Sequence, residues 1–256
     1  MKKTKRTSAI KCAENATPKM ISQLGIENRT ADLLGWQQRS FDTFRRIVSS
    51  DDFPCFFSQL AFRRKSLKFV FAESTDSPSD LLHIRIAATE YLSQRKTWRL
   101  PHLSAFVVMF RPENLTLEEY HKQTWHVLQD FVDNDPHRDN RLQRDPELPG
   151  WTLPFAGEEW FFNSSNPAQQ VRLSRNFGPS LTFVAKPRKD FDAVVGPHIK
   201  GGDKIRQMIR DRATKFDTQK VSSHVGDFHK GDSEWRGYCL FDDNKTHYAN
   251  CPIFTG

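Results

Sequence analysis

A polar, turn-rich loop holds the densest set of side chains in this chain that could bind a ligand. Two apolar runs, residues 160–162 and 181–185, flank it and predict two β-strands with a long connection. The donors and acceptors between them are Asn163, Ser164, Asn166, Arg172, Ser174 and Arg175. Functional side chains concentrate on loops that rigid elements hold in place. The pattern therefore predicts a site; the alternative is a surface loop with solvated arginines.

Two neighbouring glutamates, Glu158 and Glu159, open the first of these strands. A carboxylate can bind a planar guanidinium through two parallel hydrogen bonds, which makes it a specific partner for arginine-like molecules. Because side chains alternate along a strand, only one of the two can point into a pocket. We predict that Glu158 does, since it follows Gly157, where the backbone can approach a ligand closely.

Three arginines, Arg172, Arg175 and Arg188, are candidates for binding carboxylates. The first two are three residues apart and would converge if the loop is helical there. The hydroxyl of Ser174 and the amide of Asn163 would orient a ligand. The alternative for each arginine is an ion pair that holds the loop in place.

These residues belong to a longer pattern. F-A-G-E-x-x-F-x-N begins at Phe155, N-P at Asn166 and R-x-S-R-N-x-G-P at Arg172, and P-R-x-x-F ends at Phe191. Further motifs are F-P-C at 53–55, W-x-x-L-Q at 125–129, I-R-x-x-I-R-x-R at 205–212 and E-W-R-G-Y at 234–238. In this order, across roughly residues 40–245, they resemble the YqcI/YcgG family.

The resemblance implies a heme-dependent oxygenase that hydroxylates nitrogen, notably on guanidines such as arginine, with an electron donor that the sequence does not identify. It also implies an axial iron ligand. Cys55 is the first candidate, because a thiolate favours O–O cleavage and Phe53, Phe56 and Phe57 could pack on a porphyrin. The arginines would then hold either heme propionates or the α-carboxylate of an amino acid.

A histidine is the rival ligand. His121 shares a helical face with Trp125, whereas His126 falls on the polar side. The chain departs from many relatives at Gln169, where they carry a histidine; if that histidine binds iron in the family, this chain lacks it.

A second kind of metal site is conceivable at residues 224–229. His224, Asp227 and His229 could supply the two imidazoles and one carboxylate that suit non-heme Fe(II). The alternative is a solvated loop.

Composition narrows the class of protein. The 256 residues have a net charge of +7 and a mean hydropathy of −0.66, and include 21 phenylalanines. No apolar run can cross a bilayer, and basic residues are interleaved with acidic ones, which argues against nucleic-acid binding. The cysteines at 12, 55, 239 and 251 lack a C-x-x-C pair, so we expect reduced thiols in a cytoplasmic protein. A glycine-rich phosphate loop is missing, which weighs against nucleotide or flavin cofactors.

The order of elements predicts a single α+β domain with a mixed or antiparallel sheet and packed helices, spanning residues 29–256 after a flexible basic tail at 1–28. Four helices are expected: one from after Thr30 to about residue 49, one that begins at Pro78, and two at 116–133 and 204–216. The expected strands include 67–72, 104–110 and 234–241. In the helix at 204–216, we expect Arg206 and Arg210 to face outward, and the inward residues to be Ile205, Met208, Ile209 and Phe216.

Together these patterns predict an N-oxygenase with its pocket formed by the Phe-Pro-Cys segment, the helix of Trp125 and the central loop. The alternatives are a non-catalytic ligand-binding or structural protein of the same fold, or a non-heme iron oxygenase. The sequence leaves the oligomeric state open, including a homo-oligomer.

Overall fold

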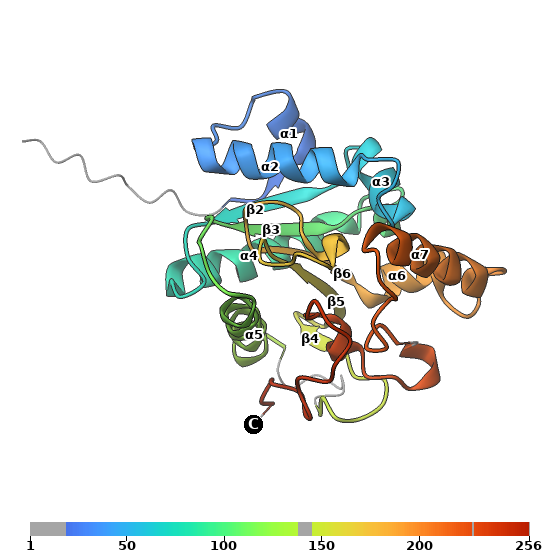
Figure 1. Cartoon of the computed structure of the whole chain (residues 1–256). Helices are drawn as coiled ribbons and strands as arrows, with labels where there is room; N and C mark the ends of the chain where they lie inside the picture. Colours follow the sequence, from blue (N-terminus) through green and yellow to red (C-terminus); the bar gives the residue numbers. More distant parts are fainter. Residues whose placement is uncertain (1–18, 138–144, 227, 256) are drawn as a thin grey trace, which may run out of the picture.

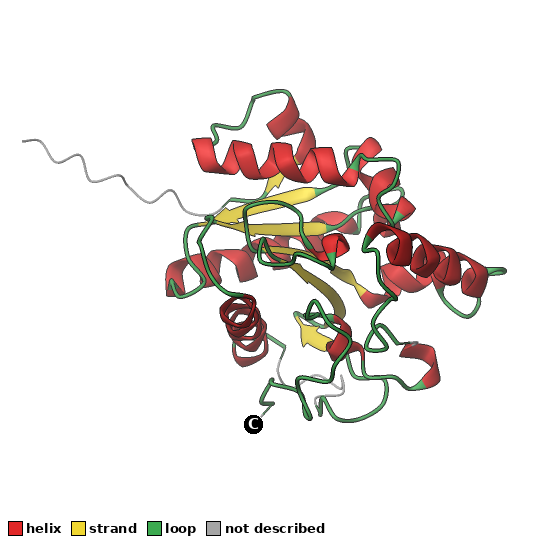
Figure 2. Ribbon diagram, in the orientation of Figure 1, coloured by secondary structure: helices red, strands yellow, loops and turns green. Residues whose placement is uncertain are grey.

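A six-stranded mixed sheet forms the centre of the computed structural model, which describes residues 19–137, 145–226 and 228–255 (Figures 1 and 2). The strands are β1 (Ile21–Ser22), β2 (Lys68–Ala72), β3 (Phe106–Phe110), β4 (Leu153–Phe155), β5 (Glu158–Ser165) and β6 (Thr182–Pro187). Their order in the sheet is β1-β2-β3-β6-β5-β4. Strands β2 and β3 are parallel, and the other neighbours are antiparallel. This arrangement confirms the predicted α+β fold.

Helices cover both faces of the sheet (Figure 1). On one face, α2 (Gly35–Val48) and α3 (Phe56–Arg63) pack phenylalanines against Phe69 and Phe71 of β2. On the other, α4 (Pro78–Arg95) and α5 (Leu117–Asp133) pack against Val70 and Phe106. Because strand side chains alternate, β2 and β3 each contribute to two separate cores. The short α1 (Gln23–Glu27) lies beside β1.

Two further helices, α6 (Arg188–Val195) and α7 (Gly202–Phe216), lie beside the sheet at the end of α3 (Figure 1). Three-residue and four-residue 3-10 helices complete the described structure: η1 (Pro101–Leu103), η2 (Leu173–Arg175), η3 (Phe228–Lys230) and η4 (Glu234–Gly237). Within the described ranges, no helix combines the length and the apolar character needed to cross a membrane.

The helix at α5 follows its sequence signals closely. The Thr116 hydroxyl accepts a hydrogen bond from the backbone N–H of Glu119, and the Glu119 carboxylate accepts one from the backbone N–H of Thr116, as in a capping box. The predicted apolar face is buried, and His121 and Leu128 have no exposed surface. The helices predicted after Thr30 and at Pro78 are also present, as α2 and α4.

Three expectations need correction. Residues 21–27 belong to the domain, since β1 pairs with β2 and the buried Gln23 side chain donates to the Phe62 carbonyl. The strand predicted at 234–241 is absent. Its residues form η4 and a loop, and in this loop the Tyr238 carbonyl accepts a hydrogen bond from the backbone N–H of Ser164 in β5. In α7, Met208 is about half exposed, whereas Arg206 and Arg210 turn toward backbone carbonyls of neighbouring segments.

A tight turn joins β4 to β5. Ala156 and Gly157, the two residues between the strands, both have positive φ angles, 53° and 78°. Two successive positive angles give the turn that matches the twist of a two-residue hairpin. Gly157 of the F-A-G-E motif therefore serves the hairpin, not the close approach to a ligand that we predicted.

Candidate functional site

A cavity of about 310 Å³ lies on the sheet face shared with α2 and α3. Strands β5 and β6 form its floor through Phe161, Asn163, Val184 and Lys186. Helices α3, α6 and α7 and the segment at residues 221–240 surround it. Its volume lies within the range of small-molecule sites.

Aromatic side chains make up much of the wall: Phe44, Phe53, Phe57, Phe161, Phe177, Phe191 and Phe228. Phe161 and Phe191 stack with ring centroids 5.3 Å apart, which joins β5 to α6. Phe53 contacts Phe177, so the Phe-Pro-Cys segment packs directly on the central loop. The predicted contribution of these two segments to one pocket is thus present in the structure.

Cys55 lines this cavity as the N-cap residue of α3. It is a free cysteine and partly exposed, whereas the free Cys239 and Cys251 are buried. Cys55 is therefore the cysteine of the described residues that a ligand in the cavity can reach.

Basic residues outnumber acidic ones in the lining. Six arginines and lysines stand against three carboxylates, counted over the described residues. The basic side chains are Arg172, Arg175, Lys186, Arg188, Arg206 and Arg210, and the acidic ones are Asp217, Asp232 and Glu234. Burial lowers the pKa of Lys186, whose Nζ donates to the His102 carbonyl at 2.7 Å. A positive excess in an enclosed space attracts an anionic ligand.

The predicted loop residues have different surroundings. Arg172 donates to the carbonyls of Phe241 and Asp243, at 2.8 and 3.0 Å, so it fixes the loop. Ser174 donates its hydroxyl to Asp217. Asn163 accepts from Ser165 through Oδ1, and its Nδ2 has no hydrogen-bond partner within the described part of the chain. Asn163 is therefore the better placed of the two to orient a ligand.

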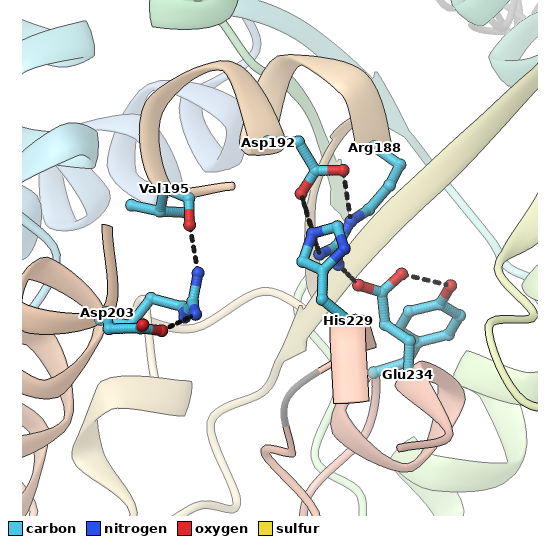
Figure 3. A network of polar contacts seen from close by, with 8 residues as sticks. Arg188, Asp192, Val195, Asp203, His229 and Glu234 are labelled. Atoms are coloured by element: carbon cyan, nitrogen blue, oxygen red, sulfur yellow. Dashed lines mark hydrogen bonds and ion pairs between the residues drawn. The ribbon is translucent and has the colours of Figure 1, made fainter. Parts of the chain in front are cut away.

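Arg188 belongs to a polar network (Figure 3). It forms ion pairs with Asp192, at 3.0 Å, and with Glu234. His229 lies 2.9 Å from the same Asp192 carboxylate. Arg188 and Glu234 are almost entirely buried, and the Arg188 guanidinium also stacks on Phe228 at 4.1 Å. These contacts correspond to the alternative considered for this arginine, an ion pair that holds the site together.

The two glutamates of β5 lie outside the cavity lining. Glu158 pairs with Lys189 at the surface, where both side chains are partly exposed. Glu159 is half-buried, and its burial raises the pKa of the carboxyl. The predicted placement of Glu158 in the pocket is wrong, because the preceding residues form the hairpin turn and direct this side chain toward α6.

His121 is also outside the cavity lining, to which α5 contributes no residue. Its ring packs edge-on against Phe241, with centroids 3.9 Å apart. Burial lowers its pKa to about 4. The predicted participation of the Trp125 helix in the pocket is wrong, because α5 lies on the opposite face of the sheet.

Gln169, which stands where we expected a histidine from the family resemblance, is likewise outside the cavity lining. Gln169 is buried and donates to the Leu240 carbonyl at 2.5 Å. This side chain joins the central loop to the C-terminal segment.

The predicted non-heme site is not assembled in the described residues, which contain no group of three or more metal-binding side chains. His224 contacts the Lys245 carbonyl at 3.3 Å, and His229 contacts Asp192. Asp227 lies outside the described residues.

Sequence reasoning missed Lys186 and Asp217. Lys186 alternates with the buried Ala185 in β6, a pattern that could have indicated the face it occupies. Asp217 follows the last residue of α7, and only the tertiary structure brings it to Ser174.

The chain belongs to the YqcI/YcgG family, whose model matches residues 44–254. It is 33% identical over 247 residues to a Streptomyces lavendulae protein named "Putative N(omega)-hydroxy-L-arginine synthase DcsA". That alignment covers 94% of this chain and 90% of the relative. No solved structure matches the chain.

Proposed function

We propose that this protein is a heme-dependent oxygenase that hydroxylates a guanidine nitrogen of arginine or an arginine-like molecule. The observation that carries the proposal is the cavity, which brings the Cys55 thiol, an aromatic wall and an excess of cationic side chains together. The name of the relative, with which the chain aligns over nearly its whole length, supports N-hydroxylation of arginine.

The residues of the cavity fit a heme in three respects. The aromatic side chains offer an apolar surface for a porphyrin, and Cys55 offers a sulfur atom that could bind the iron. Arg175 and Lys186 have no carboxylate partner in the described residues and can hold propionates. A bound heme would supply the activation of dioxygen.

The protein's own residues would bind and orient the substrate. Hydroxylation places one oxygen atom of O₂ in an N–H bond and releases the other as water, so a separate reductant must supply two electrons and two protons. The aromatic side chains of the wall would reduce the contact of a bound substrate with water. Asn163 lines the cavity and uses its Oδ1 toward Ser165, so its Nδ2 is placed to donate to the substrate.

Spectroscopy and product analysis test the proposal together. The purified protein, supplied with hemin, should bind about one heme per chain and convert arginine to an N-hydroxylated product detectable by mass spectrometry. Cys55→Ala should abolish heme retention or move the ferrous–CO Soret band away from a thiolate position. Cys251→Ala, a buried cysteine outside the cavity, is the matched control and should keep the wild-type spectrum.

Two results would contradict this assignment. If Cys55→Ala keeps the wild-type spectra while His121→Ala loses heme, the ligand is the histidine. If the wild-type protein takes up no hemin, the non-catalytic ligand-binding alternative replaces the oxygenase.

A further inference from the structure

Arg175 is a buried cation without a matching anion. The side chain is about 7% exposed and lines the cavity. One terminal nitrogen, Nη2, donates to the Gly237 carbonyl at 3.0 Å. The other, Nη1, is buried and has no hydrogen-bond partner in the described part of the chain.

The other arginines of the cavity differ from Arg175 in this respect. Arg188 and Arg206 form ion pairs with carboxylates, and Arg172 donates to three acceptors. Arg210 donates to the carbonyls of Val225 and Gly226. Arg175 has a single weak acceptor for a group that can donate five hydrogen bonds.

The nearest carboxylate does not neutralise it. Asp217 contributes to the electrostatic surroundings of Arg175, but both its oxygens accept hydrogen bonds from Ser174. Burial, followed by repulsion from Arg172, lowers the pKa of Arg175 to about 10. At neutral pH the guanidinium therefore remains charged inside the protein. A buried charge without a partner is unfavourable, and a ligand that brings an anion relieves it.

From these contacts we infer that Arg175 forms a carboxylate-binding subsite in the cavity. A planar guanidinium whose Nη1 lacks an acceptor suits a carboxylate better than any neutral group. The inference deepens the proposed function, on which it rests for the identity of the carboxylate. Two sources share this chemistry, the α-carboxylate of the amino-acid substrate and a heme propionate.

Binding measurements on a matched pair of ligands separate these sources. Arginine and agmatine share the guanidine and differ in the α-carboxylate. If the substrate carboxylate occupies the subsite, wild-type protein should bind arginine at least about tenfold more tightly than agmatine. Arg175→Gln should reduce this ratio to about one without changing heme content. If a propionate occupies the subsite, Arg175→Gln should lose heme on dilution while the ratio stays as in the wild type.

Two further variants keep the test interpretable. Arg236→Gln removes a guanidinium that lies outside the cavity lining and donates to the carbonyls of Tyr248 and Ala249, and it should preserve both heme content and ratio. If Arg175→Gln fails to fold, Arg175→Lys replaces it in the test, because it keeps the positive charge. Lysine cannot bind a carboxylate in a bidentate manner, so this variant should still lower the ratio or the heme affinity.

The inference is overturned if Arg175→Gln, or a folded Arg175→Lys, matches the wild type in heme retention and in the ratio. It is also overturned if the wild-type protein binds heme, arginine and agmatine equally poorly. Because binding is measured and not turnover, failure of the oxygenase proposal remains distinguishable. A protein that lacks hydroxylation but selects arginine through Arg175 would keep the subsite and lose the reaction.

Discussion

Ser174 binds the carboxylate of Asp217 twice, through its backbone N–H at 2.6 Å and its hydroxyl at 2.7 Å. Asp217 is the C-cap residue of α7, so this contact joins the central loop to the helix that covers the cavity. Burial raises the pKa of the carboxyl, and the two hydrogen bonds oppose that effect. The Ser174 hydroxyl is thus already used within the protein, and its predicted role toward a ligand would require it to leave Asp217.

Ser174→Ala should lower the free energy of unfolding by about 1–3 kcal/mol, because a buried carboxylate loses one of its two donors. Urea denaturation should show an earlier midpoint with an unchanged slope. Ser79→Ala, at the first turn of α4 and far from the cavity, is a suitable control. An unchanged midpoint for Ser174→Ala would mean that the contact does not stabilise the loop.

Acid should destabilise the protein through His121. The ordinary pKa of histidine is about 6.5, and burial lowers that of His121 to about 4 in the folded state. Between these values the unfolded chain binds a proton that the folded chain does not. The free energy of unfolding should therefore fall as the pH decreases from about 6.5 to about 4, by at most about 3 kcal/mol from this residue.

His121→Phe should flatten this part of the stability profile, measured by urea denaturation at a series of pH values. His126→Gln, on the exposed side of the same helix, is the comparison variant. Profiles of His121→Phe and wild type with the same slope would exclude His121 as the cause.

Glu158→Gln should leave the affinity for arginine within about twofold of the wild type, because this side chain lies outside the cavity. Its ion pair with Lys189 is partly exposed, and such pairs contribute about 0–1 kcal/mol. Calorimetry with arginine and a thermal melt measure the two quantities separately. A tenfold loss of affinity in a variant of normal stability would restore the substrate role that the sequence indicated for Glu158.

Glu234→Gln should lower the free energy of unfolding by about 3 kcal/mol, since it leaves the buried Arg188 guanidinium with Asp192 as its remaining carboxylate. Glu158→Gln, which breaks a surface pair, serves as the control and should lose far less. Equal midpoints for the two variants in urea would show that burial adds nothing to the Arg188 pair.

Local signals predicted most of the fold. The capping box at Thr116 and the apolar periodicity of α2, α4 and α5 depend on neighbouring residues, and these helices are present. The aromatic runs on each side of the central loop form the adjacent strands β5 and β6. The failures occur where few residues carry the signal. The two residues of β1 are held by a partner distant in the sequence. Residues 234–241 have strand composition, but their one backbone–backbone hydrogen bond with β5 is at Tyr238.

The site was predictable in its segments but not in its side-chain partners. The central loop and the Phe-Pro-Cys motif do line one cavity. The sequence motif does not distinguish Arg172, Arg175 and Arg188. The tertiary contacts do, because Arg172 donates to backbone carbonyls and Arg188 pairs with carboxylates, whereas Arg175 has no carboxylate partner in the described residues. Likewise, the helical phase of His121 indicated a buried face, and the sheet topology then placed that face on the side away from the cavity.

The alternation along β5 has a consequence for how this scaffold can diversify. Trp160 and Phe162 belong to the core beneath α4 and α5. The residues that alternate with them, Phe161 and Asn163, line the cavity. Changes at the second pair can therefore alter what the cavity accepts while the core that holds the strand stays intact. One short segment thus separates the residues that selection must keep for folding from those that it can vary for a new substrate.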